Sequence, residues 1–214
     1  MKAIILGIFL GLLLIGTGFA DNHPGIPLTS KSQDIGTNLV TPSFTVAPNQ
    51  LALMWVVTGQ GIPTVIDPSR TWVQVRTGSP GLRQMTLFST ISALETIGPV
   101  ELSIPVSDFW NVSVVEFPAT SVVQTAYGDW RQPSGARDHK VTLLSSGAGI
   151  TASGYGLWQG NVTPGQGLSL VGSGTCDSIS GICLRIQSSS VFVQIHRMLW
   201  PDKRHWLGIA VELQ

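Results

Sequence analysis

The sequence contains few charged residues. Only 11% of its 214 residues are charged, whereas soluble domains usually carry about 25%. The twelve basic and twelve acidic side chains also cancel, so no net field draws the chain to nucleic acid or to an anionic membrane. The composition therefore argues against a nucleic-acid partner.

Helical periodicity is missing after residue 20, and so are the common catalytic motifs. The sequence contains no Gly-x-Ser-x-Gly elbow, no His-Glu-x-x-His and no P-loop. Residues 147–152 fit a loose dinucleotide fingerprint, but Ser153-Gly154 follows where a helix would have to begin. We expect a protein without enzymatic activity, cofactor or metal ion.

Cysteine is also scarce. Cys176 and Cys183 are the only two, and Ser180-Gly181 between them supplies a turn. In an exported chain such a pair predicts a disulfide that clips one hairpin. A metal site would need more ligands, and a catalytic thiol would leave one cysteine unexplained.

Short apolar runs separated by turn residues are abundant, as are glycine (24) and proline (13). Leu51 to Val57 is a continuous apolar run that predicts a buried strand. Val112 and Val114 are expected to face inward, with Asn111 and Ser113 outward. After a polar loop at 127–140 the series begins again. Strands are expected at 39–46, 51–57, 72–76, 83–91, 100–104, 109–117, 139–145, 154–159, 168–171, 182–187, 191–200 and 207–213.

The N-terminus forms a separate object. Lys2, an apolar run over residues 3–16 and small residues up to Ala20 are typical of a secretory signal peptide. Residues 3–20 are also just long enough for an uncleaved membrane anchor, and either reading places the remainder outside the cytoplasm. We expect residues 1–20 as signal peptide or anchor, 21–36 as an extended arm or linker, and 37–214 as one β-sandwich domain.

The order of apolar and Trp-led strands resembles the jelly-roll domains of phage structural proteins and exported bacterial surface proteins. The residues that carry this likeness are the run 51–57, the loop and Trp at 67–72, and the strands at 85–91, 110–117 and 206–213. The resemblance implies an all-β, antiparallel sandwich that serves as a decoration, adhesion or binding module. The cysteine hairpin and the basic segment before Trp206 depart from the pattern, so ligand specificity stays open.

Seven tryptophans invite a carbohydrate-binding hypothesis. Trp55 is expected in the core, and Trp72, Trp110 and Trp206 begin strands, where they would cap the sandwich. Trp130 in the polar loop, and Trp158 with Gln159, are the better candidates for a glycan platform.

A second candidate site is the basic and aromatic segment from His196 to Trp206. Its candidate binding residues for an anionic glycan, headgroup or phosphate are Arg197, Trp200, Arg204 and Trp206. The alternative is a solvated turn whose charges keep an edge from pairing. His196, Asp202 and His205 make a poor metal site.

A glycosidase would need two carboxylates across a cleft, for which Glu95, Glu101, Asp108 and Glu116 are eligible in the first part of the chain. Two sequons, at Asn111 and Asn161, matter only in a eukaryotic host.

The leading hypothesis is an exported structural or adhesive protein, as a virion or surface component of a bacterial virus. It would contact other surface proteins or copies of itself, and the membrane through residues 3–20 if these are retained. A secreted carbohydrate-binding module is the alternative, and a jelly-roll glycoside hydrolase comes third.

Overall fold

The computed structural model describes residues 24–79, 81, 83–129, 138–144, 149–158, 161–172, 175–176, 178, 181–199 and 206–214. Among these residues there are strands and turns but no helix, which confirms the all-β prediction. Residues 1–20 lie outside the described residues. The strands are β1 (Ile26–Val40), β2 (Phe44–Val46), β3 (Leu51–Thr58), β4 (Thr64–Ile66), β5 (Val73–Gly78), β6 (Gln84–Ile91), β7 (Thr96–Gly98), β8 (Glu101–Phe117), β9 (Val122–Asp129), β10 (Asp138–Thr142), β11 (Ile150–Trp158), β12 (Thr163–Pro164), β13 (Ser169–Leu170), β14 (Thr175–Cys176), β15 (Ile182–Ser189), β16 (Ile195–Leu199) and β17 (Leu207–Leu213).

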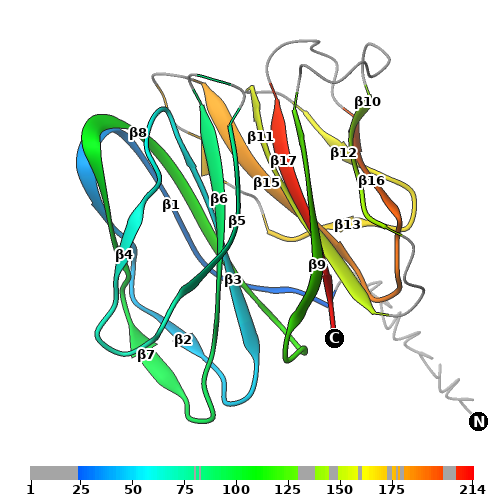
Figure 1. Cartoon of the computed structure of the whole chain (residues 1–214), viewed down its shortest axis with the longest axis horizontal. Coiled ribbons are helices and arrows are strands. Elements are labelled where there is room, and N and C mark those ends of the chain that lie inside the picture. The colour runs from blue at the N-terminus through cyan, green and yellow to red at the C-terminus, as the bar shows by residue number, and fades with distance from the viewer. Residues whose placement is uncertain are drawn as a thin grey trace, which may run out of the picture.

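Two large antiparallel sheets face each other (Figure 1). The first sheet has the order β1-β8-β3-β6-β5, with β4 also pairing with β8. The second has the order β13-β15-β11-β17-β9, with β14 also pairing with β15. Each sheet comes from one half of the chain, which we call the first half (residues 24–117) and the second half (residues 122–214).

The two halves repeat one pairing scheme. In the first half β1 pairs with β8, β8 with β3, β3 with β6 and β6 with β5; in the second, β9, β17, β11, β15 and β13 pair in the same succession. The smaller pairings match as well, with β16 as the counterpart of β7 together with the first residues of β8. β2 pairs with β7 as β10 pairs with β16, and β4 pairs with residues 101–103 of β8 as β12 pairs with β16. Only β14, among the described strands, has no counterpart. The sequence shows the second series of strands but not that it repeats the first.

Three apolar clusters separate the layers. The central cluster lies between the large sheets and contains Leu53, Trp55 and Val57 of β3 opposite Ile209 and Val211 of β17. The outer face of the first sheet forms a second cluster beneath β2 and the start of β8, and the outer face of the second sheet forms a third beneath β10 and β16. Both faces of the central strands are therefore buried, and β3 is buried at every residue.

Trp55 and Gly154 occupy equivalent positions in the two halves. Glu116 and Glu212 are each the next-to-last residue of the last strand, and they pair with Ala52 and Thr151. Trp55 and Gly154 follow those partners by three residues, and both face the central cluster. A Cβ built on Gly154 would lie 2.7 Å from Trp55 Cγ. The indole therefore fills the space that the glycine leaves on the opposite sheet.

The structure corrects several local expectations. Residues 26–36, expected in an extended arm or linker, belong to β1, and the expected strand at 39–46 is divided between β1 and β2. The strands expected at 100–104 and 109–117 join into the single strand β8, which bends over the edge of the stack (Figure 1). Asn111 does not point outward: its exposure is 0%, because the second sheet covers this face of β8.

Candidate functional site

The connections at one end of the molecule differ between the two halves. In the first half β1 and β8 continue through bends at residues 34–37 and 105–108, whereas in the second half loops at 130–137 and 200–206 interrupt the equivalent course. The connection from β5 to β6 is 79–83, but the equivalent one from β13 to β15 is 171–181. We call this end the loop end. At the opposite end the differences are smaller: 92–95 corresponds to 190–194, and 47–50 corresponds to 143–149.

The strands that flank the loops of the second half meet at the loop end. Asp129, the last residue of β9, pairs with Leu207 at the start of β17. Leu199, the last residue of β16, pairs with both Asp138 and Thr163. Loops far apart in the sequence therefore leave and re-enter the sheets beside one another. Because the same fold in the first half manages with shorter connections, the extra residues are not required by the fold.

Most of the candidate binding residues are attached to these loops. Trp130, Gln159, Trp200 and Arg204 lie outside the described residues. Trp158 is the last residue of β11, where its backbone pairs with Ile182. The structure thus brings the attachment points of the Trp130 and Trp158 segments to one end.

Trp206 was expected either to cap the sandwich at the start of a strand or to bind a ligand, and the structure corrects the second expectation. It is only 2% exposed and belongs to the third apolar cluster. Its indole stacks on His139 at 5.3 Å between ring centroids, and Tyr155 lies 6.0 Å away. Its ring packs in the third apolar cluster near the loop end and is not accessible to a ligand. Arg197 on β16, by contrast, is exposed.

His196 faces the second sheet and is fully buried. Its Nδ1 lies 2.9 Å from Ser153 Oγ, to which Gln187 Nε2 also donates a hydrogen bond at 3.1 Å. Burial lowers the pKa of His196 to about 4, while a backbone hydrogen bond at Val193 raises it, so the ring is neutral at pH 7. Asp202 and His205 lie outside the described residues, and within the described ranges no group of His, Cys, Asp and Glu is placed to hold a metal ion.

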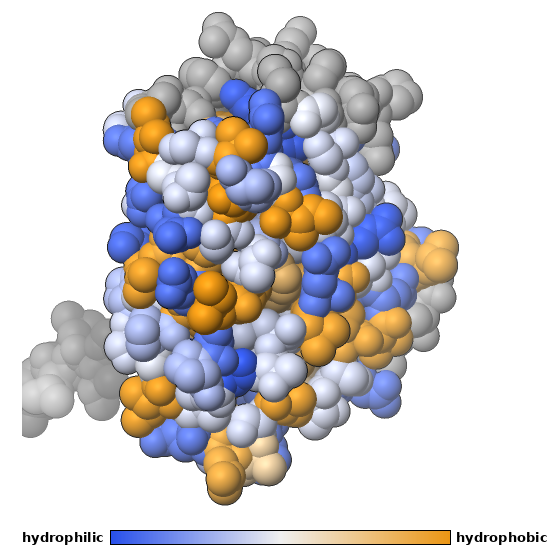
Figure 2. Space-filling view, turned by 60° about the vertical axis from the view of Figure 1, so that its left-hand side comes forward, coloured by the Kyte–Doolittle hydropathy of each residue, from blue (hydrophilic) through white to orange (hydrophobic). Residues whose placement is uncertain are grey.

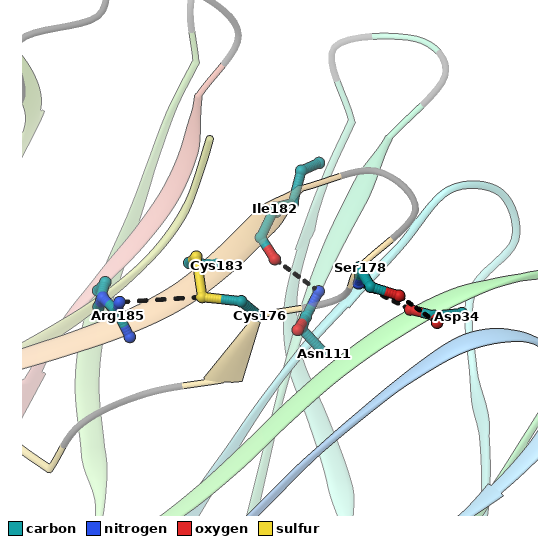
Figure 3. Close-up of a disulfide and its surroundings, with 7 residues drawn as sticks. All are labelled: Asp34, Asn111, Cys176, Ser178, Ile182, Cys183 and Arg185. Atoms are coloured by element: carbon teal, nitrogen blue, oxygen red, sulfur yellow. Dashed lines mark hydrogen bonds between the residues drawn. A yellow bond between two sulfur atoms is a disulfide. The ribbon is translucent and has the colours of Figure 1, made fainter. Parts of the chain in front are cut away.

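The disulfide between Cys176 and Cys183 is present, as predicted, and joins β14 to β15 (Figure 3). Beside it, the backbone N–H of Ser178 donates to Asp34 Oδ1 at 2.7 Å, and its hydroxyl donates to Asp34 Oδ2. Asp34 lies at the bend of β1, so this hairpin links the second half to the first. The Asp34–Ser178 contact could not be found from the sequence, because 144 residues separate the partners.

The four carboxylates considered for a glycosidase lie at separate places on the first half. Glu95 is in the connection before β7, Glu101 begins β8 and Asp108 lies at the bend of β8. Glu116 is buried and accepts a hydrogen bond of 2.6 Å from the backbone N–H of Ala47. That contact gives Glu116 a structural role in fixing the connection from β2 to β3.

The two sequons differ in exposure. Asn111 is buried between the sheets, and its Nδ2 donates to the carbonyl of Ile182 at 3.2 Å, so the folded chain does not present it to a glycosyltransferase. Asn161 is exposed.

Comparison with known proteins finds no matching family model, curated protein or solved structure. No helix in the described part of the chain is long and apolar enough to cross a membrane.

Proposed function

We propose that this chain is an exported, non-enzymatic structural component of a virion or cell surface, built from two jelly-roll units. A jelly roll has eight strands in two sheets. With β14 left aside, each half has eight strands: the first pairs with the last, the last with the third, the third with the sixth, and the second with the seventh. Jelly-roll type is thus proposed for each half separately, in place of the single sandwich expected from the sequence.

The observation that carries this proposal is the difference between the repeated halves. Two equivalent units packed through a continuous apolar cluster make a stiff support. The second unit adds most residues at the loop end, where 171–181 corresponds to 79–83 and where 130–137 and 200–206 correspond only to bends of β1 and β8. A support whose longest connections are attached at one end suits contact there with other surface proteins or with further copies of this chain. The disulfide in one of these connections is consistent with an oxidising, exported environment.

Density-gradient fractionation of the native source, with intact mass measured in each fraction, tests this role. The proposal expects the chain to travel with particles or membranes and to retain residues 1–20. A chain that stays at the top of the gradient and begins at Asp21 would contradict it.

A second candidate function is glycan binding at the loop end. The convergence of the strand ends that flank Trp130 and Trp158 favours it, because indole rings stack on the apolar faces of sugars. Glycan-array binding should be lost in Trp130→Ala and in Trp158→Ala. Leu94→Ala, at the opposite end, is the control and should bind as the unmodified chain does. Equal binding by all three variants would exclude this site.

A further inference from the structure

The end opposite the loops carries both termini of the described chain. Ile26 at the start of β1 pairs with Glu116, near the end of β8. Leu213 at the end of β17 pairs with Val122, where β9 starts. The backbone N–H groups of Thr120 and Ser121 both donate to the Gln214 carbonyl, at 2.7 and 2.9 Å. We call this end the terminal end; the C-terminus marks it in Figure 1.

Aliphatic side chains from both halves are exposed at the terminal end. Leu94 in the connection from β6 to β7 is 76% exposed, and Leu144 after β10 is 80% exposed. Val191 after β15 is 63% exposed, and Ile91 at the end of β6 is 46% exposed. Ile91 also lines a hollow of about 440 Å³ together with Val122 and the residues before it.

Exposed charge is nearly absent from this end. In the connections 47–50, 92–95, 118–121, 190–194 and the described part of 143–149, Glu95 is the single charged side chain. Glu116 and Glu212 are buried beneath them. Dehydrating this end would therefore remove few charged groups from water. Figure 2 shows the left flank of the molecule, where small apolar areas are separated by polar ones.

The N-terminal apolar run indicates that these exposed side chains lie close to a lipid bilayer. Residues 3–20 are apolar or small, and only residues 21–25 separate them from Ile26. A chain of that length spans at most about 18 Å. When residues 3–20 are held in a bilayer, the terminal end therefore lies within that distance of the lipid.

We propose that the terminal end rests on a lipid bilayer, with Leu94, Leu144 and Val191 dipping into its interfacial region. This inference rests on the proposed membrane-tethered function and adds an orientation to it. Insertion of aliphatic side chains gains free energy from the apolar area removed from water. The loop end then points away from the membrane, towards the partners of the particle or cell surface.

Spin labels on the full-length chain test the orientation. Leu94→Cys and Leu144→Cys are labelled with a nitroxide, and Ile62→Cys, at the loop end and 48% exposed, is the matched control. Each protein is reconstituted into vesicles of phosphatidylcholine and phosphatidylglycerol. The collision of each label with oxygen, which concentrates in lipid, is compared with its collision with a water-soluble nickel chelate. Unchanged circular dichroism shows that each labelled chain is folded.

The ratio of oxygen to nickel collisions should be severalfold higher at 94 and 144 than at 62. Equal ratios at the three positions, with the chain still sedimenting with the vesicles, would overturn the orientation and leave the tethered function standing. A chain that does not sediment with vesicles overturns both. A further outcome is that the labels at 94 and 144 are shielded from the nickel chelate to the same degree in detergent without lipid, in a particle of twice the mass. That result would show that a second copy of the chain covers this end, and it also overturns the proposal.

Discussion

Replacement of Gly154 by alanine adds only one methyl group, but we expect it to destabilise the packing between the two large sheets. The new methyl carbon would lie 2.7 Å from Trp55 Cγ and 2.8 Å from Trp55 Nε1, and Trp55 is fully buried. Such overpacking costs about 3 kcal/mol at its upper range, while replacing a strand glycine by alanine gains up to about 1 kcal/mol. We therefore expect Gly154→Ala to lower the free energy of unfolding by about 2 kcal/mol.

Gly156→Ala is the matched control, because it changes the same strand on the same face. Its methyl carbon would meet Leu207 Cδ2 at 3.2 Å and Val57 Cγ2 at 3.3 Å, which are the ends of aliphatic side chains. The mild contact and the gain in strand propensity should nearly cancel. Urea denaturation measures both variants, and Gly154→Ala should lose about 1 M in the midpoint relative to Gly156→Ala.

A double-mutant cycle identifies the partner of Gly154. Trp55→Leu alone should destabilise the chain by about 3 kcal/mol, because it leaves a cavity in the central cluster. Combined with Gly154→Ala it should cost at least about 1 kcal/mol less than the two separate losses together, since the methyl group then enters that cavity. Additive losses, or a Gly154→Ala variant as stable as Gly156→Ala, would refute the fit between Trp55 and Gly154.

Three further predictions concern the buried polar groups and the disulfide. Burial lowers the pKa of His196 from 6.5 to about 4, so the unfolded chain takes up more protons between these values and stability should fall by about 3 kcal/mol as the pH decreases through this window; His196→Gln should flatten that dependence in urea titrations, and an unchanged slope would contradict it. Replacing Cys176 and Cys183 together by serine should cost about 2.5 kcal/mol in the same assay, because it frees a short loop in the unfolded chain; no loss would mean that the Asp34–Ser178 contact alone holds the hairpin. Asp67→Asn should lower the free energy of unfolding by about 3 kcal/mol, and with it the melting temperature, because the guanidinium of buried Arg70, now 2.6 Å from Asp67, would lose its counter-charge. A loss no larger than that of an exposed substitution such as Glu95→Gln would exclude that role.

The pKa of Asp67 is lowered although burial acts to raise it. Hydrogen bonds from Trp72, Ser69 and Arg70 to the carboxylate outweigh the desolvation. Arg70 also donates to the Gly98 carbonyl at 2.7 Å and lies over the Phe44 ring at 4.1 Å. The sequence marks residues 67–70 only as a turn, since Gly98 and Phe44, the other partners of Arg70, belong to β7 and β2.

Much of the fold could be read from local patterns. The run at 51–57 is β3, and the alternating residues at 207–213 are β17, because strand periodicity and turn residues act over a few neighbours in the chain. The disulfide was predictable for the same reason, since its cysteines are seven positions apart. The direction of Asn111 was not, because alternation cannot tell whether a second sheet covers the polar face.

The candidate site divides in the same way. The aromatic and basic residues at 130, 158 and 197–206 can be picked out from the sequence as binding candidates. Only the strand pairing shows that the segments carrying them are attached at one end of the molecule. Trp206 shows the limit of composition alone: it lies next to a basic segment, yet its ring is buried against His139.

The sequence by itself determined an all-β chain with a disulfide hairpin and little charge, because these follow from residue type and short spacing. The tertiary structure decided that the second half repeats the first, and that Trp55 packs on Gly154 of the opposite sheet. Pairing between distant strands and packing between sheets depend on contacts across about a hundred residues of chain. The two halves share one scheme of strand pairing, although their sequences differ. That repeat is what reveals the lengthened connections at the loop end.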